Sequence, residues 1–532
     1  MSSSSAAQDY TTTWAATHED SLAFNLWTKC SRESFFALYT PFVVCLASGN
    51  LDKKTFEYYL YQDIDFLEAC IKVIEQAITT TEDEDAKKVL SKFKSGDESE
   101  IKRLKDMLDP NTKHPIHPAT KNYEQFLLDT VSGKIEGHAP FKGAILAILI
   151  FGAMMPCWRL YAALGQKILD AIGGKVDDSN PYKAWIESNG SKKLEESTRK
   201  VEQVLNKLCA TLNSEQKDVI EKLYRKSMVL EVEFFLAPTL GQSCVVPLTR
   251  QHDPAKHRLL ILSDFERTCT PVESSAVFAD MAIKAAQKSE KARPWNRCMS
   301  AAELRAKWAM LTAPKSGHVK HGSQISKISS AEMKAKWGFL FALHEQEYEQ
   351  CIESIMTSEK EEYNYEAVQK TMERFSVLER RANNRVIESG VLEGLRLEDI
   401  KQAGRRQLEF KESTTTGNII RGIESPIDKL RVFNNILKTY SDDKDNFTIY
   451  IGDSVEDLLC LLQADIGIVI GPSSSLQRVG DRLGVLFAPL FPSLIKKQKE
   501  TTEGSSPSWK KLSGMLYTVS SWAEIDAFIL GW

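Results

Sequence analysis

Two short segments far apart in the sequence carry the residue types that metal-dependent chemistry needs. They are residues 258–268 and 447–457, and each is an apolar, β-rich run that stops abruptly at acidic residues. The first run ends at Asp264 and Glu266, and the second ends at Asp453 and Asp457. Such runs are typical of buried parallel strands that deliver side chains to the carboxyl edge of a sheet. Carboxylates that meet at one edge repel each other unless a cation lies among them. The pair therefore predicts a hard-metal site of the Mg²⁺ type.

The composition limits what else the chain could be. Its 532 residues are too many for one core, so two to four domains are expected. A net charge of −4 gives no electrostatic argument for nucleic-acid binding. The ten cysteines contain no CxxC pair, which argues against a zinc site and a disulfide framework and favours a reducing compartment.

The start of the chain does not resemble an organelle transit peptide, and the most apolar window does not predict a membrane span. Residues 1–20 are rich in Ser and Thr and contain acidic residues, and the first arginine is Arg32. An organelle transit peptide is Arg-rich and acid-poor, so a disordered tail and a cytoplasmic location are expected, while a longer, mitochondrially targeted form stays open. The window 143–158 is short for a membrane span and predicts a buried helix.

Periodicity divides the chain into a helical part and a later α/β part. Amphipathic helices are expected over 21–240, followed by a polar, proline-containing linker at 241–257. The α/β domain is expected over 258–532, with helical periodicity returning at about 271–405. Further strands are expected at 447–451, 465–470 and 484–488. Within the helical insertion, 302–308 recurs as 331–337, which indicates a local duplication.

Four segments of the helical part resemble the TenA (thiaminase II) family, whose fold is an all-α, haem-oxygenase-like bundle. They are Gln62-Asp63-Ile64-Asp65-Phe66-Leu67, His117-Pro118 with Tyr123, Pro156-Cys157-Trp158 with Tyr161, and Glu231-Val232-Glu233-Phe234-Phe235. The resemblance implies that Cys157 is a nucleophile that attacks an electron-poor aminopyrimidine carbon and that Glu231 shuttles protons. It also implies a substrate pocket formed by Asp63, Phe66, Tyr123, Tyr161 and Phe234.

Each of these residues also has a purely structural interpretation. A lone cysteine in an apolar helix is usually a packing residue, and aromatic side chains at helical spacing usually belong to the core. Four segments in family order favour the functional interpretation. One position departs from the family pattern, because Asn189 stands where a pocket tyrosine is expected, and this leaves the substrate open.

The acidic segments resemble the haloacid dehalogenase (HAD) phosphatase superfamily, whose fold is a Rossmann-like α/β domain with a helical cap. The resemblance implies that Asp264 attacks phosphorus, that Glu266 acts as acid and base, and that Lys429 neutralises the phosphate. It implies Mg²⁺ held by Asp264, the Glu266 backbone carbonyl and Asp453, with support from Asp457. Glu266 replaces the usual aspartate, and its longer side chain shifts the carboxyl group. The alternative is that Asp453 caps a helix and Lys429 is a surface lysine.

One HAD element has no counterpart in the sequence. A strand ending in Ser or Thr should precede the Lys429 segment and bind the transferred phosphoryl group. The hydroxyls available there belong to Ser413, Thr414, Thr415 and Thr416, and no apolar strand precedes them. The junction Arg406–Gln407 resembles the site of a deletion of one helix and one strand. Such a loss would expose an edge of the sheet beside Asp264.

A TenA domain followed by a HAD domain resembles the plant bifunctional thiamin-salvage proteins. The expected function is Mg²⁺-dependent hydrolysis of thiamin monophosphate together with hydrolysis of aminopyrimidines or thiamin. The alternative is that the TenA half alone is catalytic and the HAD half is a degenerate binding or structural domain. Expected partners are these small molecules and, through the TenA domain, further copies of the chain, with no nucleic acid and no membrane.

Overall fold

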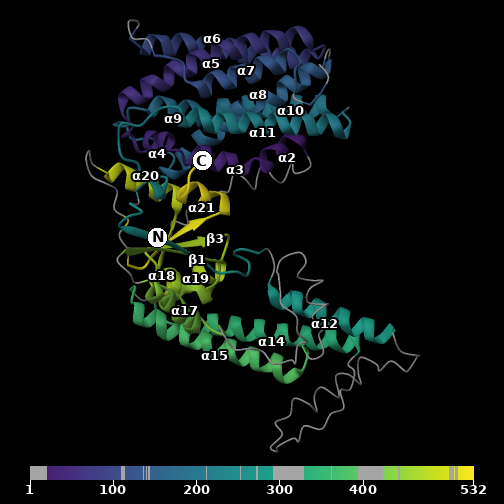
Figure 1. Cartoon of the computed structure of the whole chain (residues 1–532), viewed down its shortest axis with the longest axis vertical. Coiled ribbons are helices and arrows are strands. Elements are labelled where there is room, and N and C mark those ends of the chain that lie inside the picture. The colour runs from purple at the N-terminus through teal and green to yellow at the C-terminus, as the bar shows by residue number, and fades with distance from the viewer. Residues whose placement is uncertain are drawn as a thin grey trace, which may run out of the picture. The chain divides into compact units, whose positions relative to one another are not determined.

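The computed structural model describes residues 21–532 apart from 110–113, 136, 139–140, 142–143, 211, 252, 271–272, 292–328, 361, 393–422, 441–443, 502–508 and 510–512. They form two compact units (Figure 1). The helical unit comprises the residues up to 253 together with 489–508 and 519–532, and the α/β unit comprises 254–488 and 509–518. The predicted tail 1–20 lies outside the described residues.

The helical unit is all-α in its described residues, as the sequence predicted. Its elements are α2 (Leu22–Lys29), α3 (Ser31–Leu38), α4 (Pro41–Ser48), α5 (Lys53–Thr80), α6 (Glu84–Met107), α7 (Pro118–Val131), α8 (Ala144–Ala171), α9 (Lys183–Asn189), α10 (Lys192–Cys209), α11 (Ser214–Leu236), the 3₁₀ helix η1 (Leu248–Gln251), α20 (Leu490–Glu500) and α21 (Trp522–Ile529).

Local sequence signals explain where the longest helices begin. Asp52 accepts a hydrogen bond from the Thr55 amide at the start of α5, and α11 begins with a capping box between Asn213 and Gln216. α8 contains the apolar window and is long and apolar enough to span a membrane. However, 83% of the most apolar 18-residue stretch within Ile145–Ala171 is buried, as expected for a core helix.

The C-terminal helices belong to the helical unit by their contacts, which differs from the domain range 258–532 expected from the sequence. α20 packs against α4, and α21 packs against α3 and η1. The Gln498 side chain accepts a hydrogen bond from the Val245 amide at 2.8 Å. Val245 and Val246 are buried, so this part of the expected linker 241–257 is integrated into the core of the unit. The sequence predicted a linker at 241–257 because this segment is polar and its few apolar residues do not form a periodic pattern.

The α/β unit contains a five-stranded sheet and the helices around it. Its elements are β1 (His257–Ser263), α12 (Ser274–Lys291), α14 (Ser330–Met356), α15 (Tyr365–Ser389), α17 (Pro426–Thr439), β2 (Asp445–Gly452), η2 (Val455–Asp457), α18 (Leu458–Gln463), β3 (Ile466–Ile470), α19 (Ser474–Arg482), β4 (Leu486–Pro489) and β5 (Met515–Val519). The expected strands are present, and β5 was missed because it is short and follows a polar segment.

The strand order is β1-β2-β3-β5-β4, so β1 lies at an edge of the described sheet. β1 and β2 are parallel with Ser263 opposite Ile451, and β3 is parallel to β2. Parallel strands are normally covered on both sides, yet Ile261 of β1 is 48% exposed. The expected loss of a neighbouring strand stays a prediction, because it concerns residues that the structure does not describe. The segment 393–422, which includes Arg406–Gln407 and Ser413–Thr416, lies outside the described residues.

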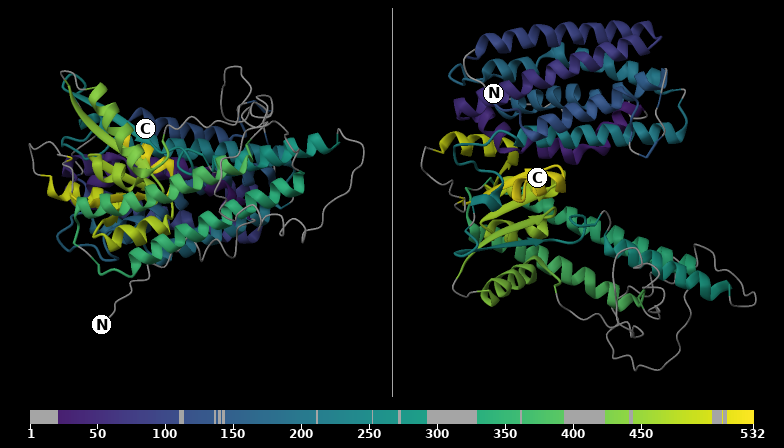
Figure 2. Two further views of the ribbon diagram at one scale, coloured as in Figure 1. Left: turned by 90° about the horizontal axis from the view of Figure 1, so that it is seen from below. Right: turned by 45° about the horizontal axis from the view of Figure 1, so that its top comes forward.

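The helices of the expected cap are anchored in two hydrophobic clusters. Ile352 and Ile355 of α14 and Phe375 of α15 pack into the core that also contains Val455 and Leu458. The other end of α14 packs against α12 in a separate cluster. Figure 2 shows α14 and α15 running side by side. The second copy of the repeat lies in α14, whereas 302–308 lies outside the described residues.

Candidate active sites

The helix that carries Cys157 is held in place from both sides. Arg159 is almost fully buried and donates to both carboxylate oxygens of Glu202, with Nε at 2.7 Å, and to Glu195 at 2.8 Å. This bidentate pair joins α8 to α10. On the other side Gly152 lets α11 approach closely, because a Cβ there would lie 2.9 Å from Ile220 Cγ2.

Gln62 and Asp63 of α5 have different roles. Gln62 is buried and accepts from the His117 amide at 2.8 Å and from Thr120 Oγ1 at 3.0 Å, so it fixes the start of α7. Asp63 is half-buried, and among the described residues its carboxylate has no hydrogen-bond or ion-pair partner. A carboxyl group left free inside a bundle is available to a ligand.

Tyr123 of α7 and Glu231 of α11 form the polar centre of the site. The Tyr123 hydroxyl donates to Glu231 Oε1 at 2.8 Å and lies 2.6 Å from Ser227 Oγ. Cys157 lies close enough to Glu231 for the carboxyl charge to raise the pKa of its thiol, after the larger effect of burial. Cys157 is half-buried although residues 151–156 of the same helix are buried. The structure thus brings thiol, carboxyl and phenol together from three helices.

Aromatic rings surround this centre. The Phe66 ring lies 4.5 Å from Tyr123 and 5.7 Å from Phe234, measured between centroids. The hydroxyl oxygen of Tyr161 lies 3.0 Å from that of Tyr59. The five predicted pocket residues come from α5, α7, α8 and α11, and two of them, Tyr161 and Phe234, share their helices with Cys157 and Glu231. Rings packed in this way provide faces for a flat heteroaromatic ligand.

Burial controls the protonation of the site. It raises the pKa of Glu231 to about 7, against the donor groups of Tyr123 and Cys157, which lower it. Burial, with Glu100 and Glu231 adding to it, raises the pKa of Asp63 to about 8. Burial and the Glu231 charge hold the pKa of the Cys157 thiol well above its usual range. The thiol therefore needs a nearby base, and Glu231 titrates near neutral pH.

Sequence analysis did not identify Tyr59 and Ser227, and it left the effect of Asn189 open. Tyr59 lies one helical turn before Asp63, and Ser227 lies one turn before Glu231, so helical spacing would have found both. The Asn189 side chain donates to the Trp185 carbonyl of its own helix at 2.9 Å. Trp185 Nε1 in turn donates to the Tyr59 hydroxyl at 3.4 Å.

The second candidate site lies at the carboxyl ends of β1 and β2. The Asp264 amide continues the ladder by donating to the Ile451 carbonyl at 2.9 Å. Lys429 follows the N-terminus of α17 and donates to Asp264 Oδ1 at 2.8 Å and to Asp457 Oδ1 at 2.9 Å. Burial alone would lower the pKa of Lys429, but the charges of Asp457 and Asp264 raise it by a larger amount, so the lysine remains charged.

Asp457 organises the loop after β2. It is fully buried, and its Oδ2 accepts from the Asp453 and Ser454 amides and from Ser454 Oγ. Its Oδ1 accepts from Tyr450 as well as Lys429. With both oxygens engaged, Asp457 orients Asp453 and Lys429. Gly452 permits this turn, because a Cβ there would lie 2.6 Å from the Asp457 side chain.

The site has the donor set of a hard cation. Carboxylate oxygens of Asp264, Asp453 and Asp457 all lie within 4.8 Å of one another. Burial, with Asp457 and Asp264 adding to it, raises the pKa of Asp453 to about 6, against the hydrogen bond from Thr268 Oγ1 at 3.0 Å. Asp264 Oδ2 and Asp453 Oδ2, which accept no side-chain hydrogen bond from the described residues, are free to bind Mg²⁺, which would relieve this repulsion.

Glu266 differs from the other residues predicted for the metal site, because its carboxylate is not part of the cluster formed by Asp264, Asp453 and Asp457. It is half-buried in the loop after Asp264. Arg267 next to it has φ of 56°, a left-handed conformation that is uncommon for a non-glycine residue. The loop therefore turns sharply directly after Glu266.

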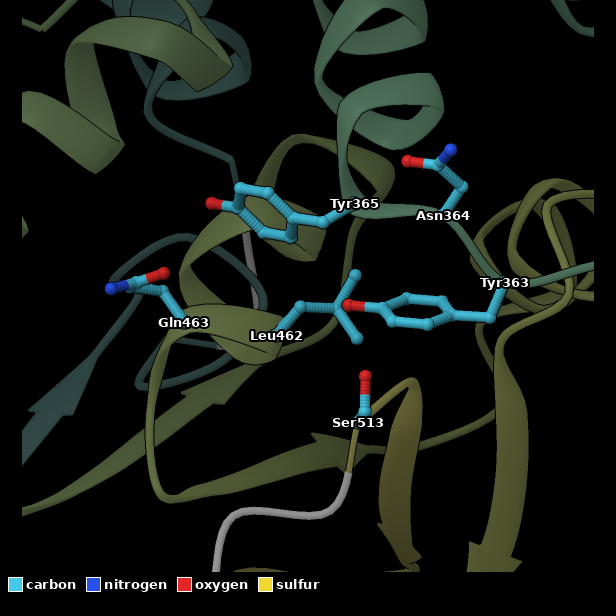
Figure 3. Close-up of a pocket in the computed structure, with 6 residues that line it drawn as sticks. All are labelled: Tyr363, Asn364, Tyr365, Leu462, Gln463 and Ser513. Carbon is cyan, nitrogen blue, oxygen red and sulfur yellow. The ribbon is translucent and has the colours of Figure 1, made fainter.

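A separate cavity of about 540 Å³ lies in the α/β unit (Figure 3). It is lined by Tyr363, Asn364, Tyr365, Leu462, Gln463 and Ser513. Gln463 comes just before β3, whereas Asp453 comes just after the parallel strand β2. The cavity therefore lies near the amino end of β3, whereas Asp264 lies at the carboxyl end of β1.

Comparisons with known proteins match both the helical part and the whole chain. The TENA/THI-4/PQQC family model matches residues 38–242. The bifunctional TH2 protein, mitochondrial, of Arabidopsis thaliana is 40% identical over 586 residues, covering 97% of this chain and 90% of the relative. That stretch is longer than this chain of 532 residues, so the relative contains residues within it that this chain lacks.

Solved structures of TenA homologues match the helical part at low identity. One from Pyrococcus furiosus is 15% identical, with coverage of 41% of this chain and 100% of that chain and a TM-score of 0.36. Another, from P. horikoshii OT3, is 16% identical, with coverage of 41% and 97% and a TM-score of 0.34.

Proposed function

The chain belongs to the family of the bifunctional TH2 protein, with a TenA domain over residues 38–242, and on this basis we propose that it is a two-site hydrolase of thiamin salvage. The helical unit hydrolyses aminopyrimidine breakdown products or thiamin. The α/β unit hydrolyses thiamin monophosphate with Mg²⁺. The observation that carries the first activity is the Cys157–Glu231–Tyr123 cluster beside the aromatic rings of Phe66 and Phe234.

Proton transfer in the helical site follows from the contacts of Glu231. The carboxylate accepts the Cys157 proton as sulfur attacks the electron-poor ring carbon, and then protonates the leaving group. Water next displaces sulfur from the ring carbon, while Glu231 takes a proton from that water and returns it to the thiolate. The Glu231 pKa near 7 suits both directions of transfer. Asp63, protonated at neutral pH, offers one donor and one acceptor, which matches a ring nitrogen beside an exocyclic amine. Tyr123 keeps Glu231 oriented toward the thiol.

The Lys429–Asp264 contact at 2.8 Å carries the second activity. Asp264 attacks phosphorus, and Lys429 neutralises charge on the nucleophile and the phosphate. Mg²⁺ bound by Asp264 and Asp453 would polarise the phosphoryl group. Asp457 acts mainly through the positions of Lys429 and Asp453. Glu266 is proposed as the acid and base, acting from the loop that turns after Asp264.

A specific observation favours the alternative of one active half. β1 has no partner on its outer side among the described strands, and the TH2 relative contains residues that this chain lacks. If a phosphate-binding hydroxyl was lost with that strand, Asp264 and Lys429 remain as a binding site with weak activity. The two proposals predict different rates with thiamin monophosphate.

One experiment separates them. Phosphate release from thiamin monophosphate is measured with and without Mg²⁺, beside aminopyrimidine hydrolysis by the same preparation. Mg²⁺-dependent release at an ordinary enzymatic rate supports two active sites. Aminopyrimidine hydrolysis alone supports the single-site alternative, and the absence of both activities contradicts the proposed function. Cytoplasmic location and self-association through the helical unit are proposed with it, and the name of the Arabidopsis relative includes the word mitochondrial.

A further inference from the structure

A second group of charged residues lies next to Lys429, on the helices α14 and α15. Arg380 of α15 contacts Asp428 at 3.5 Å, and Asp428 directly precedes Lys429. This contact brings Glu379, the residue before Arg380, to the start of α17. Figure 1 shows α15 running beside α17. Glu379 is thus a neighbour of the lysine that contacts Asp264.

Glu379 lacks a countercharge in this position. The basic side chain within 4 Å of it among the described residues is His344, whose Nε2 is 3.6 Å away, too far for a hydrogen bond. Burial lowers the pKa of His344, so this ring is mostly neutral at neutral pH. Lys429 already contacts Asp264 and Asp457. A partly buried carboxylate therefore lies beside the site without a cation.

A second carboxylate, Glu456, lies close enough to Glu379 to disfavour a negative charge on it. Burial raises the pKa of Glu379 to about 8, and the charge of Glu456 contributes to the same direction. Burial raises the pKa of the Tyr348 hydroxyl of α14, and the nearby charges of Glu456 and Glu379 add to this. Mg²⁺ at Asp264 and Asp453 would be balanced by those carboxylates and by the phosphate. It would leave Glu379 protonated at neutral pH, and a cation bound beside Glu379 would favour its ionised form.

Aromatic side chains of α14 adjoin these carboxylates. The His344 and Tyr348 rings lie 5.9 Å apart, and Tyr348 packs edge-on against Phe375 of α15 at 5.4 Å. His344 Nδ1 is buried and has no hydrogen-bond partner among the described residues. Flat rings beside a carboxylate are the combination that binds a delocalised cation, through ring faces and charge together.

We propose that Glu379, with the rings of Tyr348 and His344, is the subsite for a positively charged, flat leaving group of the phosphate ester. The α/β unit would thereby select esters of cationic heteroaromatic alcohols over neutral ones. This inference rests on the proposed phosphatase function of the Asp264 site. Glu379 is a specificity-determining residue in it, and Asp264 and Lys429 carry out the same chemistry on every ester.

The test compares esters that differ in charge, using the full chain with Mg²⁺. The substrates are thiamin monophosphate, choline phosphate, and 3,3-dimethylbutyl phosphate, which has the shape of the choline ester without its charge. Glu379→Gln should lower kcat/KM for both cationic esters by about 10- to 100-fold, mainly through KM, and change the neutral ester by less than about twofold. Glu379→Asp should restore part of the loss. Glu373→Gln, an exposed residue of the same helix, is the matched control.

Equal losses on all three esters would show that Glu379 is structural, and no loss on any would show that it does not contact the leaving group. Either result overturns the inference. If the wild-type chain hydrolyses none of the esters, the proposed phosphatase function has failed. Calorimetric titration of choline phosphate and its neutral analogue then decides. A preference for the cation that disappears in Glu379→Gln supports the subsite, and equal binding of the two esters overturns it.

Discussion

The two candidate sites differ in how completely the fold encloses them. In the helical unit, Cys157, Glu231 and Tyr123 come from three long helices whose mutual positions are fixed by buried contacts such as Arg159–Glu202. In the α/β unit, Asp264 follows an edge strand that is half exposed. A site inside a bundle keeps its geometry because every supporting helix is packed, whereas a site at a sheet edge depends on one neighbouring strand.

The largest expected effect is in the enclosed site. Cys157→Ala should reduce aminopyrimidine hydrolysis by about 10⁴-fold or more, because no other group can form the bond to the ring carbon. Phosphate release by the same variant should be unchanged. Product formation over hours of incubation is the measurement, and near-normal hydrolysis by the variant would remove Cys157 from the mechanism.

In the open site, Asp264→Asn should remove the phosphatase activity that the chain has, on the order of 10³-fold or more, since an amide neither attacks phosphorus nor balances a metal. Aminopyrimidine hydrolysis should be unaffected. Hydroxylamine-sensitive phosphate trapped on the variant would mean that another residue is the nucleophile.

Glu231→Gln tests whether the helical site depends on proton transfer. It should lower kcat by roughly 10²- to 10³-fold with little change in the dissociation constant, because the amide keeps its hydrogen bond with Tyr123 but cannot transfer protons. The pH profile should lose the step near pH 7 that Glu231 produces in the wild type. A large increase in the dissociation constant instead would assign Glu231 to binding.

Completing the edge of the sheet should make the two sites more alike. Insertion of the homologous helix and strand of a relative at Arg406–Gln407 should raise the phosphatase rate by about 100-fold, the effect of one preorganised donor, and raise the Tm. A flexible Gly/Ser insert of equal length is the control. Equal rates with both inserts, or a normal rate without either, would show that the chain does not need the strand.

The smallest effect concerns stability and pH. Asp63 and Glu231 have folded-state pKa values of about 8 and about 7, above those of unfolded carboxyl groups, near 4. The folded chain therefore binds more protons between these values, so the free energy of unfolding falls as pH rises from about 5 to about 8. Asp63→Asn should flatten the fall in Tm over this range, and the exposed control Asp106→Asn should not.

The fold could largely be predicted because its signals are local. Helical periodicity over α5, α8 and α11 and the apolar runs of β1 and β2 each lie within one stretch of sequence. The packing of α20 and α21 with the helical unit could not be predicted, since no local pattern encodes which distant surface a helix covers. For the same reason Gln62 could be assigned to a motif, but its contacts with α7 required the structure.

By itself, the sequence determined the element types, the two acidic strand ends and the four segments of the helical domain, because residue type and spacing are properties of the chain. Only the tertiary structure decided the rest. It brought Tyr123 to Glu231 across 108 positions and Lys429 to Asp264 across 165, and it placed β1 at an edge. It also decided the protonation of Glu231 and Asp63, since burial is a property of the packed fold and not of the chain.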